Sequence, residues 1–378
     1  MLKVAIIGCG KIADAHASQI ARIPGCEIVG VCDREELMAR QLQERFRIGR
    51  FFTDVGALLR EAKPAVVHVT TPPQSHFELA RQCLDQGCHV YVEKPFTLCT
   101  AEAEELIKLA GQKKLKLTAG HDAQFSHAAI RLRQLVRDGY LGGPPVHMEG
   151  YYGYELGSMY GNALLGDKQH WVRRMPGKLL QNVISHGIAR VAEYLAGDNP
   201  QVIAHGFISP MLRQAGEEEI VDELRVIIRD EGDTTGYFTF SSQMRPCLHQ
   251  FRIYGPGNGL FLDADQQIVL KLRGRRFKSY AENFIPPVTF ARQYLGSFFR
   301  NTRLFLASDF HVDSGKKHLI ESFYRSITDG LPPPIPYREI LLTSRIMDAI
   351  FEQVYRQPAE GLATGAAQPE TMRNKDVL

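Results

Sequence analysis

The N-terminus carries the pattern that most restricts how this chain can fold. An apolar run at residues 4–7 (VAII) leads directly into GCGKIA at residues 8–13, and a second apolar run at residues 28–32 (IVGVC) ends at Asp33. This order predicts a strand, a tight turn, a helix and a second strand. Such a unit typically begins a doubly wound parallel sheet.

The residue types in this turn fit a dinucleotide. Gly8 permits the tight turn, Gly10 lets a pyrophosphate approach the backbone, and the small Ala13 lets the helix pack close to the strand. The pyrophosphate is expected beside Lys11 and Ile12, where the free N–H groups and dipole of the helix N-terminus favour negative charge. A tight turn without a ligand is the alternative, but the flanking strands and Asp33 favour dinucleotide binding.

Asp33 bears on which dinucleotide is bound. It follows the glycine motif by about 20 residues, where an acid can accept hydrogen bonds from both ribose hydroxyls of the adenosine half. The same carboxylate repels the 2′-phosphate of NADP. Arg34 can stack on adenine or pair with that phosphate. We therefore predict NAD as the cofactor in preference to NADP, with Asp33 and Arg34 among its contacts.

Helix and strand patterns alternate up to residue 120, which indicates parallel strands joined by crossover helices. The expected strands lie at residues 51–53, 65–70, 89–93 and 115–120, and the expected helices at 35–46, 55–61, 75–86 and 100–112. We predict an α/β Rossmann domain, with a doubly wound parallel sheet, over residues 1–122.

From residue 146 the apolar patterns alternate as strands without helical crossovers. The expected strands lie at residues 146–154, 202–208, 223–229, 235–240, 248–254 and 268–272, and the expected helices at 179–195 and 337–355. We predict an α+β domain with an open, mainly antiparallel sheet over residues 123–356, for substrate binding and oligomerisation. Residues 357–378 lack periodicity and are predicted to be a mobile tail.

Residues 278–310 are unusually rich in aromatic side chains. Tyr294, Leu295, Phe298 and Phe299 fall on one side of a helix. We predict that this stretch packs in the core, with a lid or a subunit contact as the alternatives.

Composition excludes several classes of function. The formal charge of +3 is near balance and the basic residues form no stripe with interleaved aromatics, so we expect no nucleic-acid partner. No apolar run reaches the roughly 20 residues that span a bilayer, so we expect no membrane partner. The seven cysteines contain no CxxC pair, which favours a reducing cytoplasm and predicts no metal site.

Two loops that follow expected strands carry polar residues where ligands of a parallel sheet lie. The first reads TTPPQSH at residues 70–76, and Thr70, Thr71, Pro72 and His76 are expected to contact the ribose or the phosphates. A stiff loop whose Ser75 caps the next helix is the alternative interpretation.

The second loop reads EKP at residues 93–95. Pro95 excludes the helical region for the residue before it, so Lys94 is held extended where a nicotinamide would lie. We predict that Glu93 and Lys94 bind the cofactor, and an ordinary surface lysine is the alternative.

These motifs, together with a helix that carries Asn182 and His186, resemble the Gfo/Idh/MocA oxidoreductases. The resemblance covers nearly the whole chain. It implies a Rossmann domain plus an α/β domain, and activity on sugars, cyclitols or their derivatives with NAD or NADP. It also implies a homo-oligomer, a dimer or a tetramer, formed through the open sheet. For Lys94 the resemblance implies a hydrogen bond to the reacting oxygen.

The family usually carries an aspartate and a histidine four residues apart on the first helix of the second domain. Asn182 and His186 have this spacing, which puts both on one face of the helix. We predict His186 as the general acid/base, since its unperturbed pKa lies near neutrality, although a lone helix histidine is more often structural. Asn182 replaces the usual aspartate, and Gln124 replaces the arginine of many relatives. An amide cannot stabilise an imidazolium as a carboxylate does.

The predicted function is hydride transfer between nicotinamide and a hydroxyl or keto carbon of a sugar, cyclitol or sugar derivative, including nucleotide-linked ones. Two alternatives are an NAD-using enzyme without net redox change, for elimination or hydrolysis, and a catalytically weak dinucleotide-binding protein. Candidate residues for the wall of the substrate site are Tyr151, Tyr152, Tyr154, His170, Trp171 and Arg173.

Overall fold

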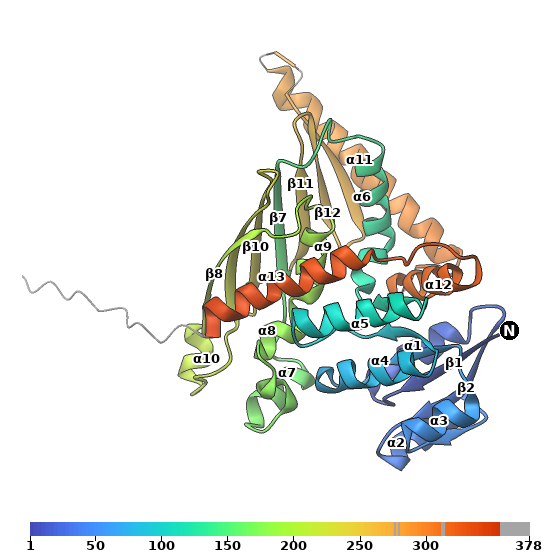
Figure 1. Ribbon diagram of the computed structural model, residues 1–378. Coiled ribbons are helices and arrows are strands. Elements are labelled where there is room, and N and C mark those ends of the chain that lie inside the picture. Colours follow the sequence, from blue (N-terminus) through green and yellow to red (C-terminus); the bar gives the residue numbers. More distant parts are fainter. Residues whose placement is uncertain (276, 279, 311–313, 356–378) are drawn as a thin grey trace, which may run out of the picture.

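The computed structural model describes residues 1–275, 277–278, 280–310 and 314–355. Figure 1 shows a parallel sheet wrapped by helices below a large, open second sheet. The predicted mobile tail at 357–378 lies outside the described residues.

The first sheet has six parallel strands in the order β3-β2-β1-β4-β5-β6. Its strands are β1 (Leu2–Ile7), β2 (Cys26–Cys32), β3 (Phe51–Phe52), β4 (Val66–Val69), β5 (His89–Val92) and β6 (Leu117–Ala119). The helices between them are α1 (Lys11–Ile20), α2 (Glu36–Phe46), α3 (Val55–Ala62), α4 (His76–Asp85) and α5 (Thr100–Gln112). The strand order reverses between β1 and β4, which confirms the predicted doubly wound sheet and places the ligand cleft beside β1.

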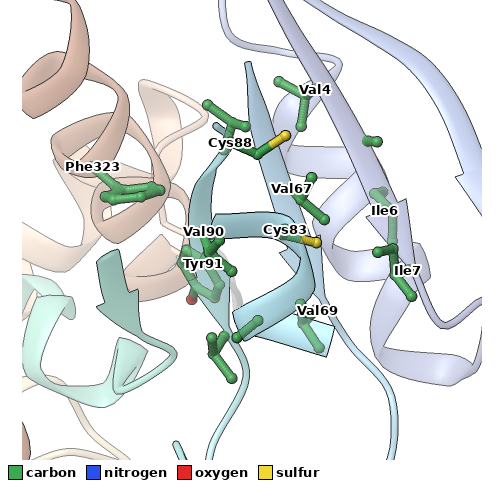
Figure 2. Close-up of a cluster of buried hydrophobic side chains, with 14 of the residues drawn as sticks. Val4, Ile6, Ile7, Val67, Val69, Cys83, Cys88, Val90, Tyr91 and Phe323 are labelled. Carbon is green, nitrogen blue, oxygen red and sulfur yellow. The ribbon is translucent and has the colours of Figure 1, made fainter. Parts of the chain in front are cut away.

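The core of this domain is completed by a helix from much later in the chain. Strand residues such as Ile6 and Val67 are fully buried (Figure 2). Helix α12 (Ser314–Thr328) adds Phe323, whose ring centroid lies 6.2 Å from that of Tyr91. The core therefore crosses the predicted domain boundary at residue 122.

The second sheet has seven strands in the order β13-β12-β11-β7-β10-β9-β8. Its strands are β7 (His147–Gly153), β8 (Gln201–Phe207), β9 (Glu223–Arg229), β10 (Thr235–Ser241), β11 (His249–Tyr254), β12 (Asn258–Asp263) and β13 (Ile268–Arg273). Every neighbouring pair is antiparallel except β7 and β10, so the prediction of a mainly antiparallel sheet is confirmed. Strand β12 was not predicted, because the glycines at its start are typical of a turn and not of a strand.

The helices of the second domain differ in part from the prediction. The helix expected at 179–195 is divided at Ile184 into α8 (Lys178–Val183) and α9 (Ser185–Ala192). The final helix, α13 (Tyr337–Tyr355), agrees with the predicted bounds. Helices α6 (His127–Arg137), α7 (Met159–Gly166) and α10 (Pro210–Gln214) were not predicted, nor were the short helical turns η1 (Pro73–Ser75), η2 (Asp122–Phe125) and η3 (Trp171–Arg174).

The prediction of core packing for the aromatic stretch is wrong. These residues form α11 (Ala281–Leu306), a long helix at the periphery of the second domain (Figure 1). Ser297 is its one fully buried side chain, whereas Phe298 is 61% and Phe299 66% exposed. The helix contacts the edge strand β13 along one narrow side, so most of its apolar side chains remain uncovered.

Candidate active site

A cleft of about 660 Å³ lies at the carboxyl ends of β1, β2 and β4, where a dinucleotide is expected. The predicted cofactor residues that line it are Gly8, Gly10, Asp33, Arg34, Thr70, Thr71 and Pro72. From the second domain, Trp171 and Arg174 also line it, and the Trp171 carbonyl accepts a hydrogen bond from Gln74 at 2.9 Å. Both domains therefore contribute to the cleft.

The glycine turn fits a pyrophosphate. Gly8 has φ +96°, and a Cβ there would lie 2.7 Å from the backbone nitrogen of Thr71, so only glycine is accommodated. A Cβ on Gly10 would meet no atom within 4 Å, so the backbone there is open to a ligand. Lys11 and Ile12 follow as the first residues of α1, whose N-terminal N–H groups favour an anion.

Asp33 is held in the cleft by backbone donors. Its Oδ2 accepts from the Cys9 N–H at 2.7 Å, and its Oδ1 accepts from the Glu35 N–H at 3.0 Å. Each carboxylate oxygen can accept a further hydrogen bond, as a ribose diol requires. The Arg34 side chain is 92% exposed and can move over this end of the cleft.

Two of the predicted cofactor contacts, His76 and Thr70, have structural roles, although Thr70 also lines the cleft. His76 is buried behind the TTPPQSH loop, and its ring nitrogens are hydrogen-bonded to the carbonyls of Thr71 at 2.8 Å and Pro95 at 2.9 Å. The Thr70 hydroxyl, although at the cleft, donates to the Gly8 carbonyl at 2.6 Å. These contacts shape the loop rather than present His76 to a ligand.

Glu93 is also committed to protein partners. Its Oε1 accepts from Lys316 Nζ at 2.8 Å and is hydrogen-bonded to His16 Nε2 at 2.7 Å. The chain of contacts continues from His16 to His68 and from His68 to the Tyr324 hydroxyl, each at 2.8 Å. Burial opposes ionisation of Glu93, but Lys316 holds its pKa well below the usual range. The carboxylate therefore lies in a buried network and not in the cofactor cleft.

Lys94 links the two domains. Its Nζ donates to the Asn182 carbonyl at 3.0 Å, so the lysine extends from the end of β5 to helix α8. Burial lowers its pKa from the ordinary value. Lys94 is thus not the exposed surface lysine of the alternative interpretation, and it reaches the helix pair that carries Asn182 and His186.

His186 lies on α9, just beyond the break that separates it from Asn182 on α8. Its side chain is 14% exposed, and its Nδ1 lies 3.8 Å from Asp122 Oδ1 without a hydrogen-bond partner. Burial lowers the pKa of His186 to about 4, and the charge of Lys94 adds to this effect. Asn182 Nδ2 donates to the Tyr160 hydroxyl at 2.6 Å. The structure therefore brings Lys94, Asn182 and His186 together, with His186 neutral at pH 7.

Sequence reasoning missed Asp122 and Lys316. Asp122 begins η2, directly beyond β6, and its Oδ2 lies 3.0 Å from Lys316 Nζ at the start of α12. Although burial opposes both charges, their attraction lowers the pKa of Asp122 and raises that of Lys316 well above its usual value. Asp122 follows an expected strand end, which could have identified it, whereas nothing near Lys316 in the sequence marks it.

Gln124, which stands where many relatives carry an arginine, does not face this site. It is buried, and its amide nitrogen donates to the Ala189 carbonyl at 3.2 Å and to Glu193 Oε2 at 3.0 Å. Its role is to fasten η2 to α9.

A second cavity, of about 290 Å³, lies between η2, α9, β7, β11 and the start of α12. Its polar and aromatic lining includes Asp122, Tyr151, Tyr152, His186, Arg190, His249, Gln250, Asp265 and Lys316. Two of the predicted wall residues, Tyr151 and Tyr152, therefore line a cavity that also contains His186.

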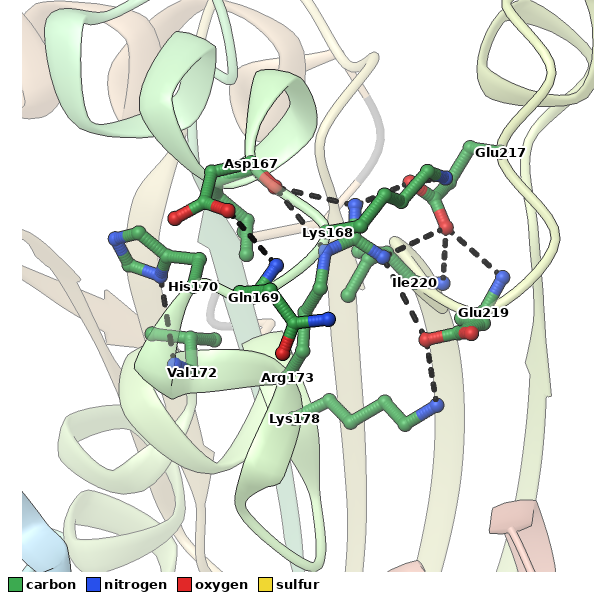
Figure 3. Close-up of polar contacts among 11 residues, drawn as sticks. Asp167, Lys168, Gln169, His170, Val172, Arg173, Lys178, Glu217, Glu219 and Ile220 are labelled. Carbon is green, nitrogen blue, oxygen red and sulfur yellow. Dashed lines mark hydrogen bonds and ion pairs between the residues drawn. The ribbon is translucent and has the colours of Figure 1, made fainter.

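The remaining predicted wall residues lie elsewhere. Arg173 is buried in an ion pair with Glu217 at 2.6 Å, which ties η3 to the segment before β9 (Figure 3), so its prediction as a wall residue is wrong. His170 stacks on Trp171 with ring centroids 5.5 Å apart, beside the cofactor cleft. The Tyr154 ring lies 6.1 Å from that of Tyr160.

Two further features bear on partners. His127, Asp309 and His318 form the one group within the described residues that could hold a metal ion, and Lys317 Nζ already lies 2.7 Å from Asp309. Among the described helices, none has the length and apolar character required to cross a bilayer.

The fold and the site together define a two-domain protein with a dinucleotide-binding cleft. Residues 2–121, about a third of the chain, match the model of the oxidoreductase family with an NAD-binding Rossmann fold, the Gfo/Idh/MocA family. The predicted family resemblance and NAD as the cofactor class are thereby confirmed.

Several known relatives match part of the chain. D-glucoside 3-dehydrogenase of Escherichia coli is 35% identical over 142 residues, which are 37% of this chain and 40% of that protein. UDP-N-acetylglucosamine 3-dehydrogenase of Acidithiobacillus ferrooxidans is 35% identical over 133 residues, 35% of this chain and 41% of that protein. The chain thus matches about two-fifths of these relatives' length.

The whole fold has a solved counterpart. The structure of the WlbA dehydrogenase from Bordetella pertussis, in complex with NADH and UDP-GlcNAcA, has a TM-score of 0.74 at 14% identity. The match covers 93% of this chain and 95% of the WlbA chain. At this identity the likeness establishes the fold of both domains.

Proposed function

We propose that this protein is an NAD-dependent dehydrogenase or reductase that acts on a CH–OH group of a sugar, cyclitol or sugar derivative. The observation that carries the proposal is the meeting of Lys94, from the NAD-binding domain, with the α8–α9 pair that bears Asn182 and His186. A proton-transfer group and a cation thus stand together beside the strand ends where NAD binds.

In the oxidising direction His186 removes the proton of the substrate hydroxyl, and Lys94 stabilises the negative charge that develops on the same oxygen. When bound, NAD supplies the acceptor for the hydride. The low pKa of His186, about 4, keeps the imidazole neutral at pH 7 and able to accept a proton. Residues placed to contact the cofactor are those of the glycine turn, Asp33 and the loop at 70–72.

Asp122 supplies the carboxylate that position 182 lacks. It lies 3.8 Å from His186 Nδ1, so it can orient the ring and stabilise the imidazolium that forms during proton transfer. Lys316 keeps Asp122 ionised. Asn182 instead positions α8 through its contacts with Tyr160 and Lys94. We assign Asp122 and Asn182 as positioning residues.

The cavity beside His186 fits a compact polyhydroxylated substrate. At about 290 Å³ it is near the lower end of small-molecule sites, which hold ~300–1,000 Å³. Arg190, Asp265 and Gln250 offer donors and acceptors for hydroxyl groups. The names of the relatives, a glucoside and a nucleotide-sugar dehydrogenase, support the same substrate class. The seven free thiols suit a reducing cytoplasm.

The test is the formation of NADH from NAD with a panel of glucosides, inositols and UDP-linked sugars, followed by absorbance. We expect turnover with at least one member and a higher kcat/KM with NAD than with NADP. Purified protein that retains NAD and eliminates or hydrolyses a substrate without net NADH formation would replace this proposal with the non-redox alternative. Binding of NAD without any reaction would leave only a dinucleotide-binding protein.

A further inference from the structure

Three ionisable side chains meet where α6, α11 and α12 come together, apart from both cavities of the active site (Figure 1). His127 begins α6, Asp309 follows the end of α11, and His318 lies near the start of α12. One ligand atom from each residue lies within 4.8 Å of the other two. The three side chains are between 17% and 29% exposed, so a small ion from solvent can reach them.

The His318 ring is oriented by a backbone carbonyl. Its Nδ1 lies 3.0 Å from the Phe125 carbonyl, which can only accept a hydrogen bond, so Nδ1 carries the hydrogen. In the neutral ring Nε2 is then an acceptor, and it lies 3.9 Å from Asp309 Oδ2 without a donor among the described residues. Two acceptors therefore face each other. This arrangement is unfavourable unless a cation lies between them.

The position of Asp309 is fixed by the turn that ends α11. Its N–H donates to the Leu304 carbonyl at 2.9 Å, and Ser308 before it has φ +55°. Lys317 Nζ donates to Asp309 Oδ1 at 2.7 Å, whereas within the described residues Oδ2 receives no hydrogen bond and faces both histidines. Carboxylates that bind metals are usually held by such a further hydrogen bond. Lys317 thus orients the carboxylate and leaves one oxygen available.

His127 completes the group from a third helix. Its Nε2 lies 3.5 Å from Asp309 Oδ2 and 2.8 Å from the Asp309 carbonyl. The rings of His127 and His318 meet edge to face, with centroids 4.7 Å apart. Both Nε2 atoms therefore lie beside the same carboxylate oxygen. When His127 gives up its contact with the carbonyl, its Nε2 becomes a second unprotonated nitrogen for a ligand.

This set of ligand atoms suits zinc. Tetrahedral Zn²⁺ holds nitrogen and oxygen ligands at ~2.0–2.2 Å, which separates the ligand atoms from one another by about 3.3 Å. The separations of 3.5 and 3.9 Å from Asp309 Oδ2 are only slightly longer. Calcium and magnesium prefer oxygen ligands alone. The prediction of no metal site rested on the spacing of cysteines, which does not bear on two imidazoles and a carboxylate.

We propose that His127 Nε2, Asp309 Oδ2 and His318 Nε2 bind one Zn²⁺, with water as the fourth ligand. The ion takes the place of the hydrogen bond from His127 to the Asp309 carbonyl and is attracted by both facing acceptors. It connects α6, the segment after α11 and α12 at one point. The role of the ion is structural, because its ligands line neither cavity of the active site.

The ion would fix the start of α12. Lys316, which precedes His318 by two residues, lies 2.8 Å from Glu93 and 3.0 Å from Asp122. A ligand that binds only the folded chain raises its stability by mass action. For a chain of this length, Zn²⁺ at a hundredfold excess over its Kd should raise the Tm by about 3 °C.

The test uses the full chain after treatment with EDTA. Zinc binding is measured by competition with a chromophoric chelator, and we expect one Zn²⁺ per chain together with the rise in Tm. His127→Gln and His318→Gln should each weaken zinc binding at least tenfold. His205→Gln, at an exposed histidine on β8, is the matched control and should bind zinc as the unmodified protein does. Circular dichroism and NAD binding verify that all three variants remain folded.

Cobalt(II) separates this group from the seven free thiols. Bound by imidazoles and a carboxylate, cobalt absorbs visible light without a thiolate charge-transfer band in the near ultraviolet. A thiolate band, or zinc binding that survives both histidine substitutions, would assign the ion to another place and overturn the proposal. Absence of binding at micromolar zinc would also overturn it, and would show that a proton, not a metal, lies between His318 and Asp309.

Discussion

The cofactor cleft and the proposed substrate cavity are built from different parts of the chain. Apart from Trp171 and Arg174, the residues that line the cleft lie within residues 7–79, most of them at the strand ends and in the loops that follow them. The cavity is formed by charged and aromatic side chains that range from Asp122 to Lys316. The residues that line the cofactor cleft are therefore mostly close together in the sequence, whereas the proposed chemistry on the substrate depends on side chains from distant parts of the chain.

The largest expected effect is on catalysis and leaves cofactor binding unchanged. Replacement of His186 by alanine should lower kcat by about 10²–10⁴, since positioned acid/base catalysis contributes this much. The affinity for NAD should change little. Because neutral His186 is the base and its pKa is about 4, the unmodified enzyme should lose activity as pH falls through about 4. This loss of activity at low pH, the acid limb of the pH–rate profile, should be absent in His186→Ala. Rates measured against pH test this. A parallel loss of NAD binding would contradict the separation of the two sites.

A smaller effect is expected for Asp122→Asn. If the imidazolium formed in the reaction closes the 3.8 Å gap and donates a hydrogen bond to Asp122, that bond contributes ~1.5–3 kcal/mol, so kcat should fall roughly 10- to 100-fold. Asp122 raises the pKa of His186, so its removal should shift the acid limb to lower pH. The exposed Asp138→Asn is the matched control. A reduced kcat with no change in the pH at which activity is lost would indicate that Asp122 does not affect His186 directly. Its role would then be to hold Lys316 and the surrounding fold in place.

The smallest effect concerns the cofactor side. Asp33→Ala should lower the affinity for NAD about tenfold, which corresponds to the loss of one or two hydrogen bonds from the ribose. It should also reduce the difference in affinity between NAD and NADP. The value of kcat at saturating NAD should be unchanged. Calorimetric titration with both dinucleotides measures the two affinities. Tighter binding of NADP than of NAD by the unmodified protein would show that Arg34, not Asp33, determines the preference.

Much of the first domain could be predicted because its signals are local. The glycine turn and the buried strands are read from a few adjacent residues, and the bounds expected for the Rossmann helices differ from the structure by only a few residues. The positions of His76 and Glu93 could not be predicted in this way. Their loops were identified correctly, but their side chains bind buried partners. His76 is hydrogen-bonded to the Pro95 carbonyl, and Glu93 accepts from Lys316, which lies far away in the sequence.

The limit of prediction from the sequence is clearer in the second domain. Asn182 and His186 were placed on one helix, and the break at Ile184 leaves both near Lys94. The carboxylate beside His186 comes instead from Asp122, which is 64 residues away in the chain (186 − 122). For α11 the apolar period indicates that one side of the helix is covered, but it does not say whether the same chain provides the cover.

The packing of α12 into the first domain has a consequence for how the protein is made. A ribosome delivers the six parallel strands long before residues 314–340, which supply Phe323, Tyr324 and Ile340 to their core. Until those residues emerge, Tyr91 and its neighbours lack part of their apolar cover, and Glu93 lacks its lysine. The NAD-binding domain is thus synthesised before the second domain, but its core can be completed only by a segment that follows the strands of the second domain.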